Sequence, residues 1–110
     1  MQFHQNLTKE NWQSLPFFNQ MANVGAEIGR AINWRSKDEK ISKTAVERAL
    51  ELLDLTIDDS KNKKHLKELC RLREVLADYF YFNNVYDSSD EKWNNYFYGF
   101  NYAAAVKKGF

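Results

Sequence analysis

The sequence predicts an all-α protein that folds as an antiparallel up-down-up-down four-helix bundle. Apolar residues recur at helical spacing along most of the chain. The chain has one proline and four glycines, so few positions interrupt a helix. The loops between the periodic stretches are short, which favours antiparallel neighbours. We expect a single domain over residues 1–110, with helices at roughly 9–35, 38–57, 61–82 and 89–107.

The first helix is expected to begin after Thr8 as its N-cap and to break near Pro16, because proline is tolerated only in a first turn. Leu7 is placed to pack on Trp12 as a hydrophobic staple. A glycine costs about 1 kcal/mol inside a helix, so a strip of small residues after the break predicts close approach of another helix. A loosely wound segment is the alternative. The strip comprises Ala22, Gly25, Ala26 and Gly29.

Capping signals mark two of the later helices. Ser36 and Glu39 form a capping box before the helix over 38–57, and Ser88 and Glu91 form another before the last helix. The helix over 61–82 follows a turn with the sequence DDSKN and has apolar residues at helical spacing.

The last helix, over 89–107, is apolar on opposite sides. One side is expected to face the core and carries Trp93, Tyr96, Phe97, Phe100 and Ala104. The other side carries Tyr98, Tyr102, Ala105 and Val106. A helix that is apolar on both sides is usually buried on both sides, and a four-helix bundle covers only one of them. The sequence therefore predicts an interface, with the candidate residues Trp93, Tyr96, Tyr98, Tyr102 and Val106.

Three partners are able to cover the second side of this helix. They are a second copy of the chain, the N-terminal residues Phe3, Leu7 and Trp12, or a different protein or nucleic acid. Tyrosine favours an interface, because its ring is buried while its hydroxyl stays in water. The alternative is that these tyrosines simply tolerate partial exposure.

Charged residues also occur within the apolar stripes. Arg73 lies in the stripe of the third helix, Arg48 at the edge of the second, and Glu27 beside the first. A buried guanidinium needs a partner, so we expect Glu27 and one of Glu74 or Asp78 to reach Arg48 and Arg73 across the bundle. Such a network either fixes helix register or lines a pocket for an anionic ligand.

A run of basic residues gives an alternative function. Lys64, Lys67 and Arg71 share one face of the third helix, and Lys61 and Lys63 precede them. Such a face is suited to phosphate contacts. The acidic residues Glu68, Glu74 and Asp78 interleave with it, so an ordinary solvated face is the competing interpretation. A net charge of +1 argues against a strongly electrostatic nucleic-acid binder.

Catalytic and metal-binding patterns are not found in the sequence. The chain has two histidines, His4 and His65, and one cysteine, Cys70, which is too few for the usual tetrahedral metal sites. No phosphate-binding glycine loop follows a strand pattern. We expect Cys70 to be a small buried hydrophobe. The sequence therefore predicts a protein that is not an enzyme and holds no cofactor.

The location expected from the sequence is the cytoplasm. No basic start followed by an apolar run indicates a secretory signal. No stretch approaches the roughly 20 apolar residues of a membrane span. A single cysteine fits a reducing compartment.

Three stretches, PFFNQMANVGAEIGRAINW, VERALELLDLTIDD and ELCRLREVLADYF, resemble a family of small prokaryotic all-helical proteins with no established activity. In size and helix count the chain is also similar to oligomeric prokaryotic bundles. These include proteins encoded in ribosomal RNA intervening sequences and the basic, nucleic-acid-binding accessory proteins of diversity-generating retroelements, from which the +1 charge departs.

These observations together favour a non-enzymatic assembly or regulatory protein. It is expected to bind itself or a partner protein through the helix over 89–107. The alternative is a nucleic-acid accessory protein that uses the basic face of the third helix.

Overall fold

The computed structural model describes residues 8–107, and the fold is all-α, as predicted. The predicted roles of Phe3 and Leu7 fall outside the described residues. The elements are α1 (Lys9–Gln13), α2 (Phe17–Trp34), α3 (Glu39–Ile57), the 3₁₀ helix η1 (Ser60–His65), α4 (Leu66–Tyr81) and α5 (Asp90–Lys107). The up-down-up-down order remains a prediction.

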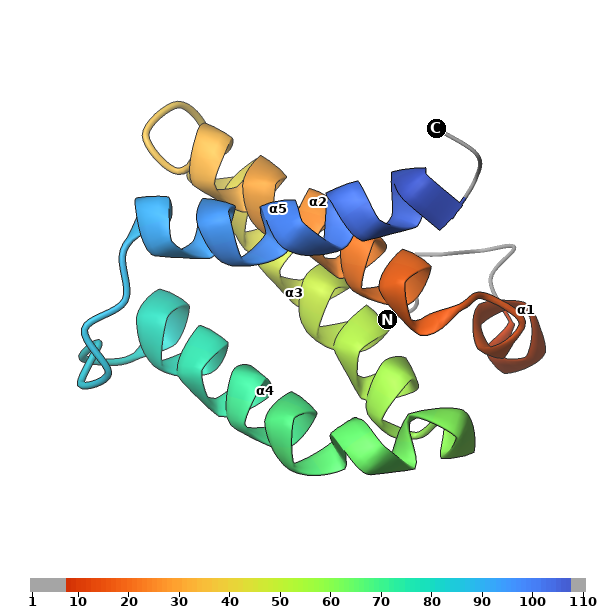
Figure 1. Ribbon diagram of the computed structural model, residues 1–110. Coiled ribbons are helices and arrows are strands. Elements are labelled where there is room, and N and C mark those ends of the chain that lie inside the picture. Colours follow the sequence, from red (N-terminus) through yellow and green to blue (C-terminus); the bar gives the residue numbers. More distant parts are fainter. Residues whose placement is uncertain (1–7, 108–110) are drawn as a thin grey trace.

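Helix α2 packs against both α3 and α5, and α4 packs against α3 (Figure 1). One hydrophobic core joins these four helices. Met21, Val24 and Ile28 enter it from α2, Leu52 and Leu53 from α3. Helices α4 and α5 contribute large side chains to the same cluster: Leu69, Leu72, Leu76, Trp93 and Phe97.

The small strip on α2 has two different roles. A Cβ on Gly25 would lie 2.7 Å from the Cβ of Phe97, which confirms the close approach of a neighbouring helix at that position. A Cβ on Gly29 would meet nothing within 4 Å. Only Gly25 is therefore required by the packing.

The N-terminal cap of α1 is the one that the sequence predicts, but the caps of α3 and α5 differ from the prediction. Thr8 caps α1, since its Oγ1 accepts a hydrogen bond from the amide of Asn11. Asp38 rather than Ser36 caps α3, and its side chain accepts from the amides of Lys40 and Ile41. Before α5, the hydroxyl of Ser89 rather than Ser88 accepts from an amide of the first turn, that of Lys92. Both predicted capping boxes are wrong.

The expected helix over 61–82 is divided into η1 and α4. Asp59 caps η1, because its Oδ1 accepts a hydrogen bond from the amide of Lys61 at 3.1 Å. The apolar residues predicted at helical spacing lie in α4, where Leu69, Leu72 and Leu76 are buried. Lys61, Lys64 and His65 of η1 line a pocket together with Phe17 and Phe18 at the start of α2.

The loop between α4 and α5 is held by side-chain hydrogen bonds. Asp78, which is buried, accepts from the amides of Val85 and Tyr86, both at 3.1 Å. Asn84 accepts from the amide of Ser88 and donates to its carbonyl oxygen. Asn84 and Asp87 have φ values of 54° and 55°, a conformation that Asn and Asp adopt more readily than most residues. The loop therefore has a defined shape that fixes where α5 begins.

Candidate functional site

The structure separates the five predicted interface residues of α5 into two groups. Trp93 is 5% exposed and belongs to the core of its own chain, so its assignment to an interface is corrected. Tyr96 is half-buried and lines a pocket between α4 and α5. Tyr98 and Tyr102 lie outside the core, with exposed fractions of 68% and 58%. The side chain of Val106 falls outside the described part of the structure.

The environment of Tyr96 explains its inward position. Its ring packs edge-to-face against Trp93 and Phe97, with ring centroids 6.0 and 5.0 Å away. Burial, reinforced by the negative charge of Glu68, raises the pKa of the Tyr96 hydroxyl to about 12. Tyr96 is thus a neutral packing residue at physiological pH.

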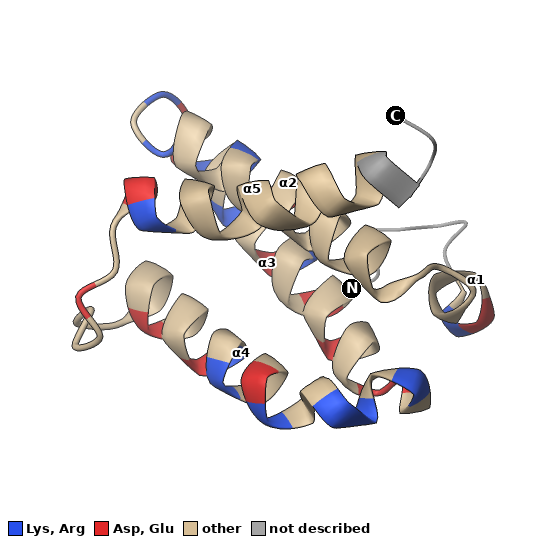
Figure 2. Cartoon of the chain, viewed as in Figure 1, with Lys and Arg blue, Asp and Glu red and all other residues tan. Residues whose placement is uncertain are grey.

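After its charged first turn, where Glu91 and Lys92 are exposed, α5 has six exposed residues up to Ala105, which we call the α5 outer face: Asn94, Asn95, Tyr98, Gly99, Asn101 and Tyr102. No charged residue occurs between Lys92 and Lys107. Figure 2 shows the contrast with α3 and α4, which carry charges along their length, while the coloured charges of α5 lie in its first turn. A Cβ on Gly99 would meet nothing within 4 Å, so the packing of the chain does not require glycine there.

The predicted ion-pair network is not assembled in the way that the sequence suggested. Arg73 pairs with Asp54 of α3, with its Nε 2.6 Å from Oδ1, and both side chains are about half exposed. The hydrogen bond to Asp54 raises the pKa of Arg73 further. Arg73 thus pairs with Asp54, which the predicted set of carboxylates, Glu27, Glu74 and Asp78, did not include.

Two other acidic members of that network serve other contacts, and the pairing of Glu27 with Arg48 remains a prediction. Asp78 holds the α4–α5 loop, and Glu74 accepts a hydrogen bond from the hydroxyl of Tyr86 at 2.9 Å. Arg48 is half-buried on α3. One carboxylate oxygen of Glu27 is buried and accepts no hydrogen bond from the described residues.

A buried polar cluster that the sequence did not reveal joins α1, α2, α3 and η1. Gln20 donates to the carbonyl oxygen of Trp12 at 3.0 Å and to Asp59 at 2.9 Å. Asn62 donates to the Gln20 side chain at 2.8 Å and to the carbonyl oxygen of Thr56 at 3.0 Å. The indole N–H of Trp12 donates to the Thr56 hydroxyl at 3.1 Å. Each donor is satisfied, so the cluster fixes the relative positions of these four segments.

Asp59 carries the charge of this cluster. Its side chain is 5% exposed, and burial alone would raise the pKa of its carboxyl group. Hydrogen bonds from the Lys61 side chain, Gln20 and the Lys61 amide outweigh that effect and lower the pKa below its ordinary value. Lys61 also donates to the carbonyl oxygen of Gln13 at 2.9 Å, which ties η1 to the end of α1.

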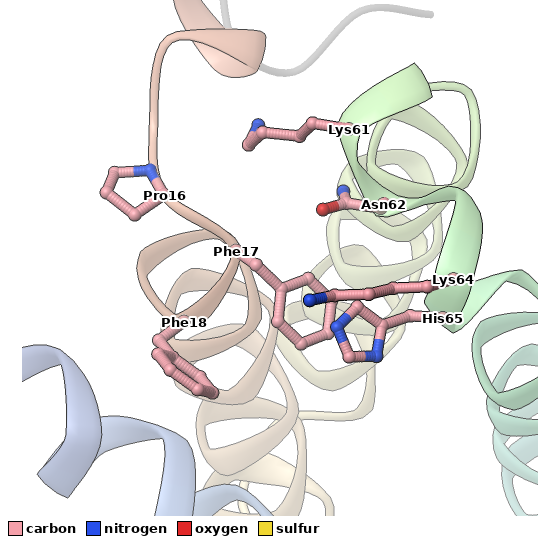
Figure 3. A pocket seen from close by; sticks show the side chains of 7 residues that line it. All are labelled: Pro16, Phe17, Phe18, Lys61, Asn62, Lys64 and His65. Atoms are coloured by element: carbon pink, nitrogen blue, oxygen red, sulfur yellow. The ribbon is translucent and has the colours of Figure 1, made fainter.

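A pocket of about 320 Å³ lies beside this cluster (Figure 3). Aromatic residues at the start of α2 form one side, and residues of η1 form the other. The imidazole of His65 stacks on the ring of Phe17, with centroids 4.1 Å apart and planes 4° apart. The lining residues are Pro16, Phe17, Phe18, Lys61, Asn62, Lys64 and His65.

The five residues of the predicted nucleic-acid face have different environments. Lys61 is engaged with Asp59, and the guanidinium of Arg71 lies 5.3 Å from the ring centroid of Tyr86. Lys63, Lys64 and Lys67 are exposed and form no ion pair with any residue of 8–107. Of these three lysines, Lys64 lines the pocket, and Lys67 lies in the first turn of α4.

The described residues also bear on metal binding, on the state of Cys70 and on membrane insertion. Within residues 8–107, no group of three or more His, Cys, Asp or Glu side chains is placed to hold a metal ion. Cys70 is exposed, so its predicted burial is wrong. None of the helices in residues 8–107 has the length and apolar character needed to cross a membrane.

Comparisons with protein families, with curated proteins and with solved structures find no match to this chain. The resemblance to small prokaryotic helical proteins therefore remains a prediction.

Proposed function

We propose that the protein is a non-enzymatic assembly module of the cytoplasm that binds a second copy of itself through the α5 outer face. The observation that supports this proposal is the exposure of Tyr98 and Tyr102 on a helix surface without charges. Their rings have no place in the core of the chain, because Trp93, Phe97 and Ala104 fill that side of α5.

The composition of the α5 outer face is suited to binding protein. Tyrosine supplies a large contact area at a low cost in side-chain entropy, and asparagine and glycine supply adaptable hydrogen bonding. Charged residues are depleted from the centres of interfaces, and this face has none. An ordinary solvent-facing helix surface carries charges, as α3 does at Lys43, Glu47 and Asp54.

A second copy is the partner that this face fits best. In a two-fold symmetric interface, a residue near the axis meets its own equivalent, so a charge there meets a like charge. Asparagine side chains and tyrosine hydroxyls both donate and accept hydrogen bonds, so each is able to pair with its own kind. The α5 outer face is therefore self-complementary in its chemistry.

The size of the surface predicts weak association. From Trp93 to Ala105 the helix is roughly 20 Å long and about 10 Å wide. An interface built on this helix alone falls well below the roughly 800 Å² per partner of a standard stable complex. We therefore expect a dimer that forms at micromolar or higher concentration.

Sedimentation equilibrium tests the proposal. The wild type is expected to show a mass that rises with concentration, and the double variant Tyr98→Glu, Tyr102→Glu is expected to stay monomeric, because it places like charges in the interface. The matched control is Phe82→Glu, Val85→Glu, which adds the same charges at equally exposed apolar positions of the α4–α5 loop and should still associate. A monomeric wild type at every concentration would leave docking of a different protein as the use of this face.

A second candidate function, nucleic-acid binding by the basic residues near η1, is favoured by the absence of ion pairs at Lys63, Lys64 and Lys67 among the described residues. Its test is binding of a labelled single-stranded oligonucleotide at low and moderate salt, with affinity expected to fall steeply as salt increases.

A further inference from the structure

The pocket between the start of α2 and η1 combines two recognition features. The rings of Phe17 and Phe18 are contributed by the first turn of α2, and Lys64 and His65 face them from η1 (Figure 3). Its volume of about 320 Å³ is at the lower end of the range for small-molecule sites, about 300–1,000 Å³. The pocket is therefore of a size that suits a ligand as large as one nucleotide.

The aromatic side of the pocket already holds a flat ring in stacking geometry. The nearly parallel rings of Phe17 and His65 lie at a stacking separation. Phe100 of α5 packs edge-on behind Phe17, with centroids 6.0 Å apart, and supports its ring. Phe17 and His65 each cover one face of the other's ring, so a planar ligand packs on the aromatic lining from outside this stack.

The charge at the pocket favours an anion. Asp59, the nearby carboxylate, is already engaged by Lys61 and Gln20. Lys64 makes no ion pair with the described residues, and Figure 3 shows its amine reaching toward the Phe17 and His65 rings. Lys63 and Lys67 are near it in sequence and exposed. A negative group bound at Lys64 therefore gains a charge-assisted hydrogen bond without displacing an existing partner.

We propose that this pocket binds a nucleotide, with the base against the aromatic wall and the phosphate at Lys64. A nucleotide joins a flat ring and an anion within one small ligand, which matches both features. The ligand is either a free mononucleotide or one nucleotide of a single strand, and the two share the same chemistry. The inference is independent of assembly through α5, and it deepens the second candidate function by naming where a base is held.

Chemical-shift titration of the full chain tests the proposal, with the ring signals of His65 and Phe17 as reporters. The ligands are AMP, adenosine, inorganic phosphate and a short single-stranded oligonucleotide. AMP is expected to shift both rings and to bind about tenfold more tightly than adenosine or phosphate, because each of these lacks one of the two contacts. The oligonucleotide titration distinguishes a free mononucleotide from one nucleotide of a single strand. Tighter binding than AMP at the same signals assigns a strand, and weaker binding assigns a free nucleotide.

Two variants with a matched control sharpen the test. Lys64→Gln should weaken AMP about tenfold and leave adenosine unchanged. Lys40→Gln removes the same charge from the start of α3 and should bind AMP as the wild type does. Phe17→Leu should weaken AMP and adenosine together, and the Lys64→Gln result stands even if Phe17→Leu fails to fold.

Three results would overturn the proposal that this pocket binds a nucleotide. The first is the absence of shifts at His65 and Phe17 with millimolar AMP. The second is equal weakening of AMP by Lys64→Gln and Lys40→Gln, which indicates attraction by net charge only. The third is oligonucleotide binding that leaves both rings unshifted, which retains a phosphate-binding basic face but removes the base site.

Discussion

Gly25 of α2 and Phe97 of α5 are in contact so close that a side chain has no room at position 25, since a Cβ there would lie 2.7 Å from the Cβ of Phe97. The contact joins the central helix to the inner side of the helix that bears the α5 outer face. It therefore sets which residues of α5 point to solvent.

The first prediction concerns this contact. Gly25→Ala should lower the free energy of unfolding by about 1–3 kcal/mol, because the methyl group forces α2 and α5 apart. Gly29→Ala is the matched control. No atom lies within 4 Å of its added Cβ, so it should stabilise by up to about 1 kcal/mol through helix propensity. Urea denaturation measures both, and equal effects of the two substitutions would contradict the packing.

The second prediction concerns the buried polar cluster. Thr56→Val keeps the shape of the side chain but removes the acceptor of the Trp12 indole N–H. It should cost about 1–3 kcal/mol of stability, because a buried donor loses its partner. Thr44→Val, at a half-buried position of the same helix, should cost less. Urea midpoints compare the two, and a Thr56→Val protein as stable as Thr44→Val would remove the structural role of this hydrogen bond.

The third prediction concerns pH. The pKa of Asp59 is lowered in the folded protein from an ordinary value of 3.8. Its contribution to stability is therefore complete above that value and is lost as pH falls through the lower folded pKa. Asp59→Asn should be less stable than the wild type at neutral pH, and the difference should shrink below about pH 4. Denaturation at a series of pH values tests this, and a difference that stays constant into acid would contradict it.

The fourth prediction separates folding from association at Gly99. Gly99→Ala should stabilise the monomer by up to about 1 kcal/mol, because nothing in the chain lies near the added methyl group. It should weaken the dimer about tenfold if a second helix approaches there closely, which corresponds to about 1.4 kcal/mol. Denaturation at low concentration and sedimentation at high concentration give the two values. Unchanged association would show that position 99 lies outside the contact.

The sequence predicts the helical class because apolar periodicity and the Thr8 cap are local features. It misplaces the cap of α3 because the chain keeps turning after α2, where the amides of Lys37 and Asp38 both bond to the carbonyl oxygen of Trp34. This turn includes Ser36 and leaves Asp38 as the first residue able to cap the next helix.

The candidate sites are less accessible to sequence reasoning, because they depend on contacts between distant segments. Gln20 lies between Phe17 and Val24 on the buried side of α2, and a polar residue at that position is the one signal that predicts a buried polar cluster. Asn62 gives no such signal, because its partners come from α2 and the end of α3. Arg73 was expected to be buried, but its long stem lets the guanidinium reach Asp54 at the surface.

Dilution of the isotope-labelled wild type, followed by NMR, tests assembly through the α5 outer face most directly. The side-chain amides of Asn94 and Asn95 and the backbone amide of Gly99 are exposed reporters on that face. The account predicts that their signals shift with concentration while those of the Phe82–Val85 segment stay constant. Signals of Asn95 and Gly99 that are unchanged from micromolar to millimolar concentration, or shifts confined to another surface, would contradict it.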